Sequence, residues 1–141
     1  MSYTVDASVC ARWMIPGEEH EAQAGRIRDD YAAGLIKLCA PTLLPFELLN
    51  TIWKGVERRL MEADVAISMC EAFIKIQPRE VSLEIEDMRR ALEIAVENHI
   101  TVYDATYIAT ASKTKTTLIA ADSRLLEVAR HYQRAMHLKD Y

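Results

Sequence analysis

Short apolar runs that alternate with longer segments of helical periodicity constrain the fold of this chain more than any other feature. The clearest run spans residues 116–121 and is apolar almost throughout, as a strand buried on both faces should be. Shorter strand-like runs lie at 3–5, 37–40, 80–83, 101–102 and 135–138. Strands that alternate with helices predict an α/β domain built around a parallel sheet.

Helical spacing of apolar residues fills the intervals between these runs. Gly34 is a candidate C-cap, and Thr42 is a candidate N-cap for the helix that Pro45 helps to start. The chain has no internal repeat, no Ser/Gly-rich linker and no long charge run, so we expect one domain over residues 1–141. The predicted helices span 8–14, 18–33, about 45–60, 62–76, 85–98, 104–112 and 122–132.

Four acidic residues occupy similar places in this pattern. Asp6, Asp104 and Asp122 each follow a predicted strand and precede a predicted helix. Glu47 lies in the first turn of the helix that starts near Pro45. Each acid alone also suits a helix cap. Because the carboxyl ends of parallel strands emerge at one edge of a sheet, the pattern predicts that the four carboxylates meet in one cleft.

The segments around these acids are VDASV at 5–9, PFELLN at 45–50, YDATYIA at 103–109 and ADSRL at 121–125. In this order and spacing they resemble the PIN domain, and within that family the VapC-type toxins of toxin–antitoxin pairs. The resemblance covers essentially the whole chain. It implies a three-layer fold with a central, mainly parallel sheet flanked by helices. It also implies a metal-dependent endoribonuclease that hydrolyses RNA phosphodiester bonds.

The resemblance assigns the catalytic and metal-binding positions to Asp6, Glu47, Asp104 and Asp122. Four gathered carboxylates repel one another, and a hard divalent cation with oxygen ligands, Mg²⁺ or Mn²⁺, relieves that repulsion. We expect Asp6 and Asp104 to ligate directly, and Glu47 and Asp122 to hold a second ion or to act through water. The sequence does not decide between one ion and two.

Several neighbours of the acids are candidates for supporting roles. Ser8, Asn50 and Ser123 could each orient a carboxylate or a water, or could make only a local backbone bond. The family often has Thr or Ser two residues before the last acid, where this chain has Ala120, and Ser123 could replace that hydroxyl. Three cations could contact RNA phosphate, although charged residues on helices usually lie on solvated faces: Arg12, Lys54 and Arg124.

The charge balance and the pattern of apolar residues limit the partners and the cellular location that we expect. With 17 Lys and Arg against 21 Asp and Glu, the chain does not have the strongly basic surface of many nucleic-acid binders, but a nuclease that uses metal ions is not excluded. No stretch approaches the roughly 20 apolar residues of a membrane helix, and we expect no signal peptide and no membrane partner. Three widely separated cysteines are consistent with a reducing cytoplasm: Cys10, Cys39 and Cys70.

The resemblance further implies an RNA substrate, a cognate antitoxin protein and a homodimer. Aromatic and Met side chains around the central helices could form a face for such a partner or could belong to the core: Trp13, Tyr31, Trp53 and Met61. Two other functions stay open. One is a catalytically weak PIN-like module that binds RNA or a partner, with Ala120 as a symptom, and the other is a non-toxin RNA-processing nuclease. A receiver domain is disfavoured, because Asp6 lies too near the terminus for a phospho-acceptor and no well-placed Lys follows the strand before Asp122.

Overall fold

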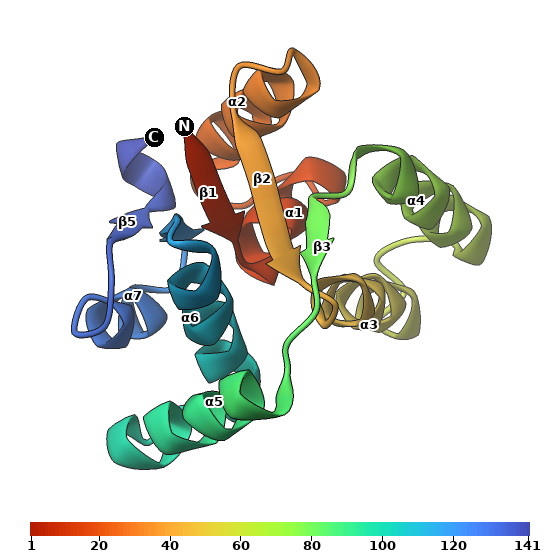
Figure 1. Ribbon diagram of the computed structural model, residues 1–141. Helices are drawn as coiled ribbons and strands as arrows, with labels where there is room; N and C mark the ends of the chain where they lie inside the picture. Colours follow the sequence, from red (N-terminus) through yellow and green to blue (C-terminus); the bar gives the residue numbers. More distant parts are fainter.

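The computed structural model describes residues 1–141 and contains five strands and seven α-helices (Figure 1). In chain order the elements are β1 (Ser2–Val5), α1 (Ala7–Met14), α2 (Glu21–Ala32), β2 (Lys37–Pro41), α3 (Leu44–Glu57), α4 (Ala63–Ile76), β3 (Arg79–Val81), α5 (Ile85–Asn98), α6 (Val102–Thr114), β4 (Thr117–Ala120), α7 (Ser123–Ala129) and β5 (Ala135–His137), followed by a short 3₁₀ helix, Leu138–Asp140.

The five strands form one sheet in the order β3-β2-β1-β4-β5, and every neighbouring pair is parallel. The chain starts in the centre at β1, builds outward through β2 and β3, and then returns to build outward on the other side through β4 and β5. The order therefore reverses between β1 and β4. In open α/β sheets the crevice at such a reversal, outside the carboxyl ends of the strands, is the usual place for a site.

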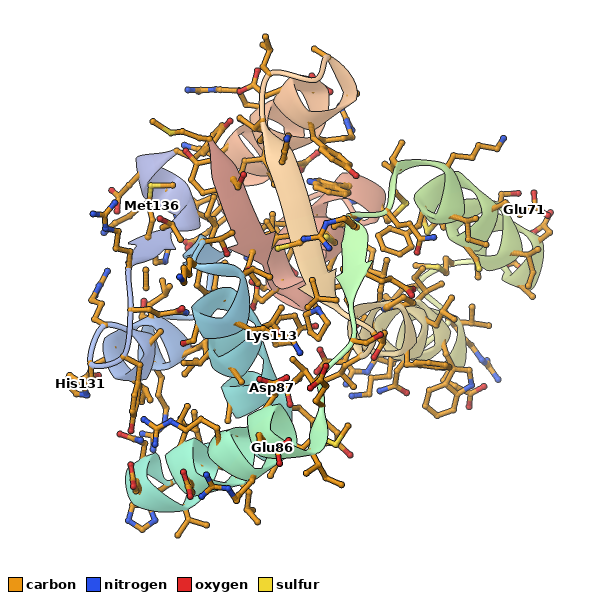
Figure 2. All side chains as sticks on the ribbon, in the orientation of Figure 1. Glu71, Glu86, Asp87, Lys113, His131 and Met136 are labelled. Carbon is orange, nitrogen blue, oxygen red and sulfur yellow. The ribbon has the colours of Figure 1, made fainter.

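Helices cover both faces of the sheet. In Figure 1, α6 lies in front of the strands and contacts β1, β2 and β4, while α1 lies behind them and packs against β4, α2 and α3. Helix α5 packs along α6, and an ion pair between Asp87 Oδ2 and Lys113 Nζ at 2.5 Å joins these two helices (Figure 2). The predicted three-layer α/β fold with a parallel sheet is confirmed.

One buried apolar cluster extends from Val5 near the amino terminus to Leu138 near the carboxyl terminus. The two termini lie close together in Figure 1, and the rings of Tyr3 and Tyr141 meet edge to face with centroids 6.0 Å apart. The same apolar cluster therefore contains residues from both ends of the chain. No helix in the chain has the length and apolarity that a membrane span requires.

The strand predicted at 101–102 is wrong, and this changes the position of Asp104. Thr101 is the N-cap of α6, and its Oγ1 accepts a hydrogen bond from the Asp104 backbone N–H at 3.1 Å. The threonine hydroxyl thus satisfies a free amide of the first helical turn, which favours a helix start over a strand. Asp104 consequently lies in the first turn of α6 and does not follow a strand.

Several predicted boundaries also move. Thr42 is not the N-cap of α3, because that helix begins at Leu44, with Leu43 before it and no side-chain cap. Helix α2 begins later than predicted, since His20 adopts a left-handed conformation with φ 64°. Strand β3 lies at 79–81 instead of 80–83, and α7 ends at 129 instead of 132.

Candidate functional site

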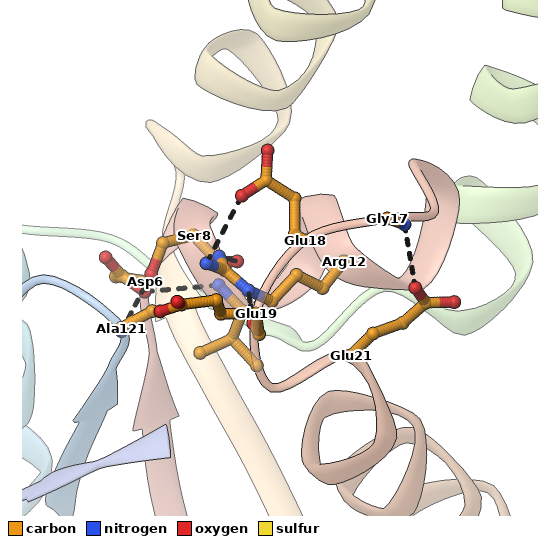
Figure 3. Close-up of polar contacts among 9 residues, drawn as sticks. Asp6, Ser8, Arg12, Gly17, Glu18, Glu19, Glu21 and Ala121 are labelled. Carbon is orange, nitrogen blue, oxygen red and sulfur yellow. Dashed lines mark hydrogen bonds and ion pairs between the residues drawn. The ribbon is translucent and has the colours of Figure 1, made fainter. Parts of the chain in front are cut away.

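Asp6 lies at the centre of the candidate site. It follows the last residue of β1, caps the amino end of α1, and is only 7% exposed (Figure 3). Its Oδ1 accepts hydrogen bonds from Ser8 Oγ at 2.6 Å and from the Val9 backbone N–H at 3.3 Å. Burial raises the pKa of Asp6 to about 7, the bonds from Ser8 and Val9 oppose the rise, and the charges of Asp122 and Glu47 add to it.

Ser8 connects the two loops that flank the reversal in strand order. Its hydroxyl donates to Asp6 Oδ1 and accepts from the Ala121 backbone N–H at 2.9 Å, as Figure 3 shows. It therefore ties the segment after β1 to the segment after β4. Ala120 is fully buried, and the Ser123 side chain makes no hydrogen bond with the protein. Ser8, and not Ser123, thus supplies the hydroxyl between these two loops.

Glu47 projects from the first turn of α3 and is half-buried. Its Oε2 accepts a hydrogen bond from the hydroxyl of Tyr107, a buried residue of α6. Burial raises the pKa of Glu47, the bond from Tyr107 opposes the rise, and the charge of Asp104 adds to it. The carboxylate is therefore held in place by a residue 60 positions away in the sequence.

Asp104 and Asp122 complete the set of acids. Asp122 follows β4, caps α7 and accepts a hydrogen bond from the Leu125 backbone N–H at Oδ1, at 3.0 Å. Asp104 is half-buried in the first turn of α6, and its backbone N–H donates to Thr101 Oγ1. Burial raises the pKa of Asp104, contacts with Thr101 oppose the rise, and the charge of Asp122 adds to it.

The four acids are thus coupled by charge. The charges of Asp122 and Glu47 raise the pKa of Asp6. The charge of Asp104 raises the pKa of Glu47, and the charge of Asp122 raises the pKa of Asp104. Each also keeps at least one oxygen free of protein hydrogen bonds. As the side chains stand, no three acidic, histidine or cysteine side chains converge on a point that could hold a metal ion. The arrangement is a set of neighbouring carboxylates with free oxygens, and ligation would require them to draw together.

The three candidate cations differ in their contacts. Arg12 is largely committed to the protein, because it donates to the carbonyl oxygens of Glu19 at 2.7 Å and Ser8 at 2.6 Å, and lies 3.7 Å from Glu18 (Figure 3). Lys54 is exposed and has no ion pair. It follows Glu47 by seven residues, so it lies on the same side of α3.

Arg124 is exposed and makes one weak contact, from Nη2 to the His99 carbonyl oxygen at 3.3 Å. Asn50 is exposed one turn after Glu47, and its side chain makes no hydrogen bond with the protein. Lys54, Arg124 and Asn50 therefore remain available to a ligand, whereas Arg12 mainly braces α1 against the segment that precedes α2.

Tyr107 is the residue of this site that sequence reasoning did not identify. Its place in the segment YDATYIA, three residues after Asp104, was the available signal, since residues i and i+3 share a helix face. An aromatic residue at that spacing usually indicates core packing, and the ring of Tyr107 does belong to the core. Only the tertiary structure shows that its hydroxyl contacts an acid of another helix.

Comparison with known proteins gives a consistent result. The PIN domain family model matches residues 3–131. The chain is 30% identical to Ribonuclease VapC3 of Pyrobaculum aerophilum over 128 residues. This match covers 90% of this chain and 94% of VapC3.

Two solved structures share the fold. VapBC2 of Rickettsia felis, bound to a DNA fragment from its promoter, has a TM-score of 0.71 at 12% identity and covers 97% of this chain and 98% of its own. VapC20 of Mycobacterium tuberculosis, described as a toxin that cleaves the sarcin–ricin loop, has a TM-score of 0.65 at 18% identity. The match covers 87% of this chain and 92% of VapC20. At these identities the two structures support the fold alone.

Proposed function

The chain belongs to the PIN domain family, and we propose that it is a metal-dependent endoribonuclease, the toxin of a VapBC-type toxin–antitoxin pair. The observation that carries this proposal is the group of four charge-coupled carboxylates at the carboxyl edge of the parallel sheet. The 30% identity to a VapC ribonuclease supports the substrate class. We propose Asp6, Glu47, Asp104 and Asp122 as the catalytic and metal-binding residues.

The donor set of the site fits Mg²⁺ or Mn²⁺. All four side chains offer carboxylate oxygens, the ligands that these hard cations prefer, and each has an oxygen that no protein donor occupies. The chemistry that such a cation supplies is polarisation of the scissile phosphate and a lowered pKa of the attacking water. Burial, with a smaller contribution from neighbouring negative charge, raises the pKa of Asp6 and Asp104, and a bound cation would favour their charged forms.

The other residues of the site would bind and orient. Ser8 fixes the Asp6 carboxylate against the loop that carries Asp122. Lys54 and Arg124 are exposed and could pair with phosphates of a bound RNA. The contacts of Arg12 favour a bracing role over a direct RNA contact.

Metal titration of RNA cleavage tests this proposal. With the protein stripped by EDTA, we expect no cleavage of structured RNA, and cleavage that rises with added Mn²⁺ or Mg²⁺ to a plateau. Ca²⁺ is the matched control, because it favours larger and more flexible oxygen coordination. Mn²⁺ binding without cleavage across varied RNAs would instead favour the RNA- or partner-binding module. Cleavage confined to precursor RNAs, with no effect on growth, would favour a processing nuclease.

Exposed apolar side chains support the proposed protein partners. A cavity of about 290 Å³ between α3 and α4 is lined only by apolar residues and includes Trp53, which is 55% exposed. Trp13 is buried and is not part of this surface. A second apolar row runs along the outer side of α5, whose inner side packs on α6: Ile85, Met88, Leu92 and Val96. We propose that these two surfaces serve a second copy of the chain and the antitoxin.

The oligomeric state of charged variants tests the assignment of surfaces. Light scattering should give the purified chain twice its 16.0 kDa mass. We expect one of Ile67→Glu, on α4, and Leu92→Glu, on α5, to halve that mass while the other leaves it unchanged, because only one surface is needed for a dimer. A dimer that survives both substitutions would contradict the assignment.

We further propose that the protein acts in the cytoplasm, where RNA and a co-expressed antitoxin are found.

A further inference from the structure

The hydroxyl of Tyr107 has a single partner, and that partner is an acid of the candidate site. The side chain is 2% exposed, and its O–H donates only to Glu47 Oε2. Tyr107 lies one turn after Asp104 on α6, whereas Glu47 lies in the first turn of α3. The bond therefore connects the two helices that supply the acids not found at strand ends.

The direction of this bond fixes the roles of the two carboxylate oxygens. A carboxylate has no proton to donate, so the phenol hydroxyl of Tyr107 is the donor and Glu47 Oε2 is the acceptor. Oε2 of Glu47 is therefore occupied, while Oε1 has no protein partner. We propose that Tyr107 is a positioning residue, whose hydroxyl holds Oε2 of Glu47 so that Oε1 is the oxygen presented to a divalent cation. This inference rests on the proposed function.

Packing alone does not account for the hydroxyl. Phenylalanine would fill the same core space, and a buried hydroxyl costs free energy unless it is hydrogen-bonded. The chain also contains a second tyrosine-to-glutamate pair. Tyr132 donates to Glu97 Oε2 at 3.0 Å and also accepts a bond from Asn98 Nδ2 at 2.7 Å, and neither Tyr132 nor Glu97 contributes to the raised pKa of Asp6, Glu47 or Asp104. Tyr132→Phe removes this bond together with the one from Asn98, so it controls for the loss of a tyrosine-to-glutamate bond that involves none of the four acids.

Mn²⁺ binding by the full chain without RNA, measured by electron paramagnetic resonance, tests the inference. We expect Tyr107→Phe to weaken Mn²⁺ affinity about 10-fold to 100-fold, the range for losing a partner that orients a metal ligand. Tyr132→Phe should leave the affinity unchanged. In a Glu47→Gln background, Tyr107→Phe should weaken binding no further, because the carboxylate that the hydroxyl holds is already absent. Near-ultraviolet circular dichroism checks the fold of each variant.

The outcomes separate this inference from the proposed function. Wild-type affinity in Tyr107→Phe would overturn the positioning role while leaving the nuclease proposal intact. A wild-type protein that neither binds Mn²⁺ nor cleaves RNA would overturn the proposed function, and the inference with it. Should Tyr107→Phe not fold, Glu47→Asp keeps the charge but withdraws the carboxylate from the phenol. It is expected to weaken Mn²⁺ binding to a similar extent, and an unchanged affinity would overturn the inference.

Discussion

Asp6→Asn abolishes RNA cleavage and leaves the fold intact: this is the largest effect that we expect from a single substitution. Asp6 is the most buried of the four acids, and its free oxygen lies at the reversal in strand order. Asparagine keeps the shape and can still accept the bonds from Ser8 and Val9, but it removes the charge that a cation requires. We expect the cleavage rate to fall by at least about 100-fold, because substitution of residues that only orient metal ligands already lowers metal affinity or activity by about 10- to 100-fold.

Asp64→Asn is the matched control for this loss. Asp64 is exposed in the first turn of α4, its side chain accepts only a local bond from the Val65 backbone N–H, and it is not one of the four acids of the candidate site. Both variants should give the same far-ultraviolet circular dichroism as the wild type. Cleavage by Asp6→Asn at the wild-type rate, with saturating Mn²⁺, would remove Asp6 from the catalytic set.

The free energy of unfolding of the metal-free protein should fall as the pH rises from about 4 to about 7. The pKa of Asp6 is 3.8 in its ordinary environment and about 7 in the folded protein. The folded state therefore binds more protons than the unfolded state in this window, and deprotonation favours unfolding. The raised pKa values of Glu47 and Asp104 act in the same direction. We expect a total loss of about 2 to 4 kcal/mol.

Urea denaturation in EDTA at pH 5 and at pH 7.5 measures this loss. Asp6→Asn should make the pH dependence much flatter and should be more stable than the wild type at pH 7.5, because no buried charge forms. His137, whose burial lowers its pKa, acts in the opposite direction and is unchanged by the substitution. An equal pH dependence in the two proteins would show that Asp6 is not the group responsible.

The strands and the strand-end acids were predictable because local signals specify them. The apolar run at 116–121 and the short run before Asp6 both form central strands, and both are followed by an acid that caps a helix. Asp104 was placed after a strand because Thr101-Val102 is β-branched. A side-chain cap overrides that propensity, and a two-residue run carries too little pattern to reveal the competition.

The contacts between distant segments could not be predicted. Ser8 was a candidate for its proximity to Asp6, yet its bond to the Ala121 amide depends on β1 and β4 being neighbours. The bond from Tyr107 to Glu47 depends on how α6 packs beside α3. Arg12 was a candidate RNA contact because its charge is visible in the sequence, whereas the carbonyl oxygens that it binds are not.

The reversal of strand order has a consequence for the newly made chain on the ribosome. The site draws Asp6 from the beginning of the chain and Asp122 from near its end, and β4 must insert beside β1 before the two acids meet. A nascent chain that has emerged only as far as α5 has the first half of the sheet but lacks two of the four acids. On the proposed assignment of the four acids, the nuclease site is therefore incomplete until both β4 and the segment after it have been made and have folded against β1.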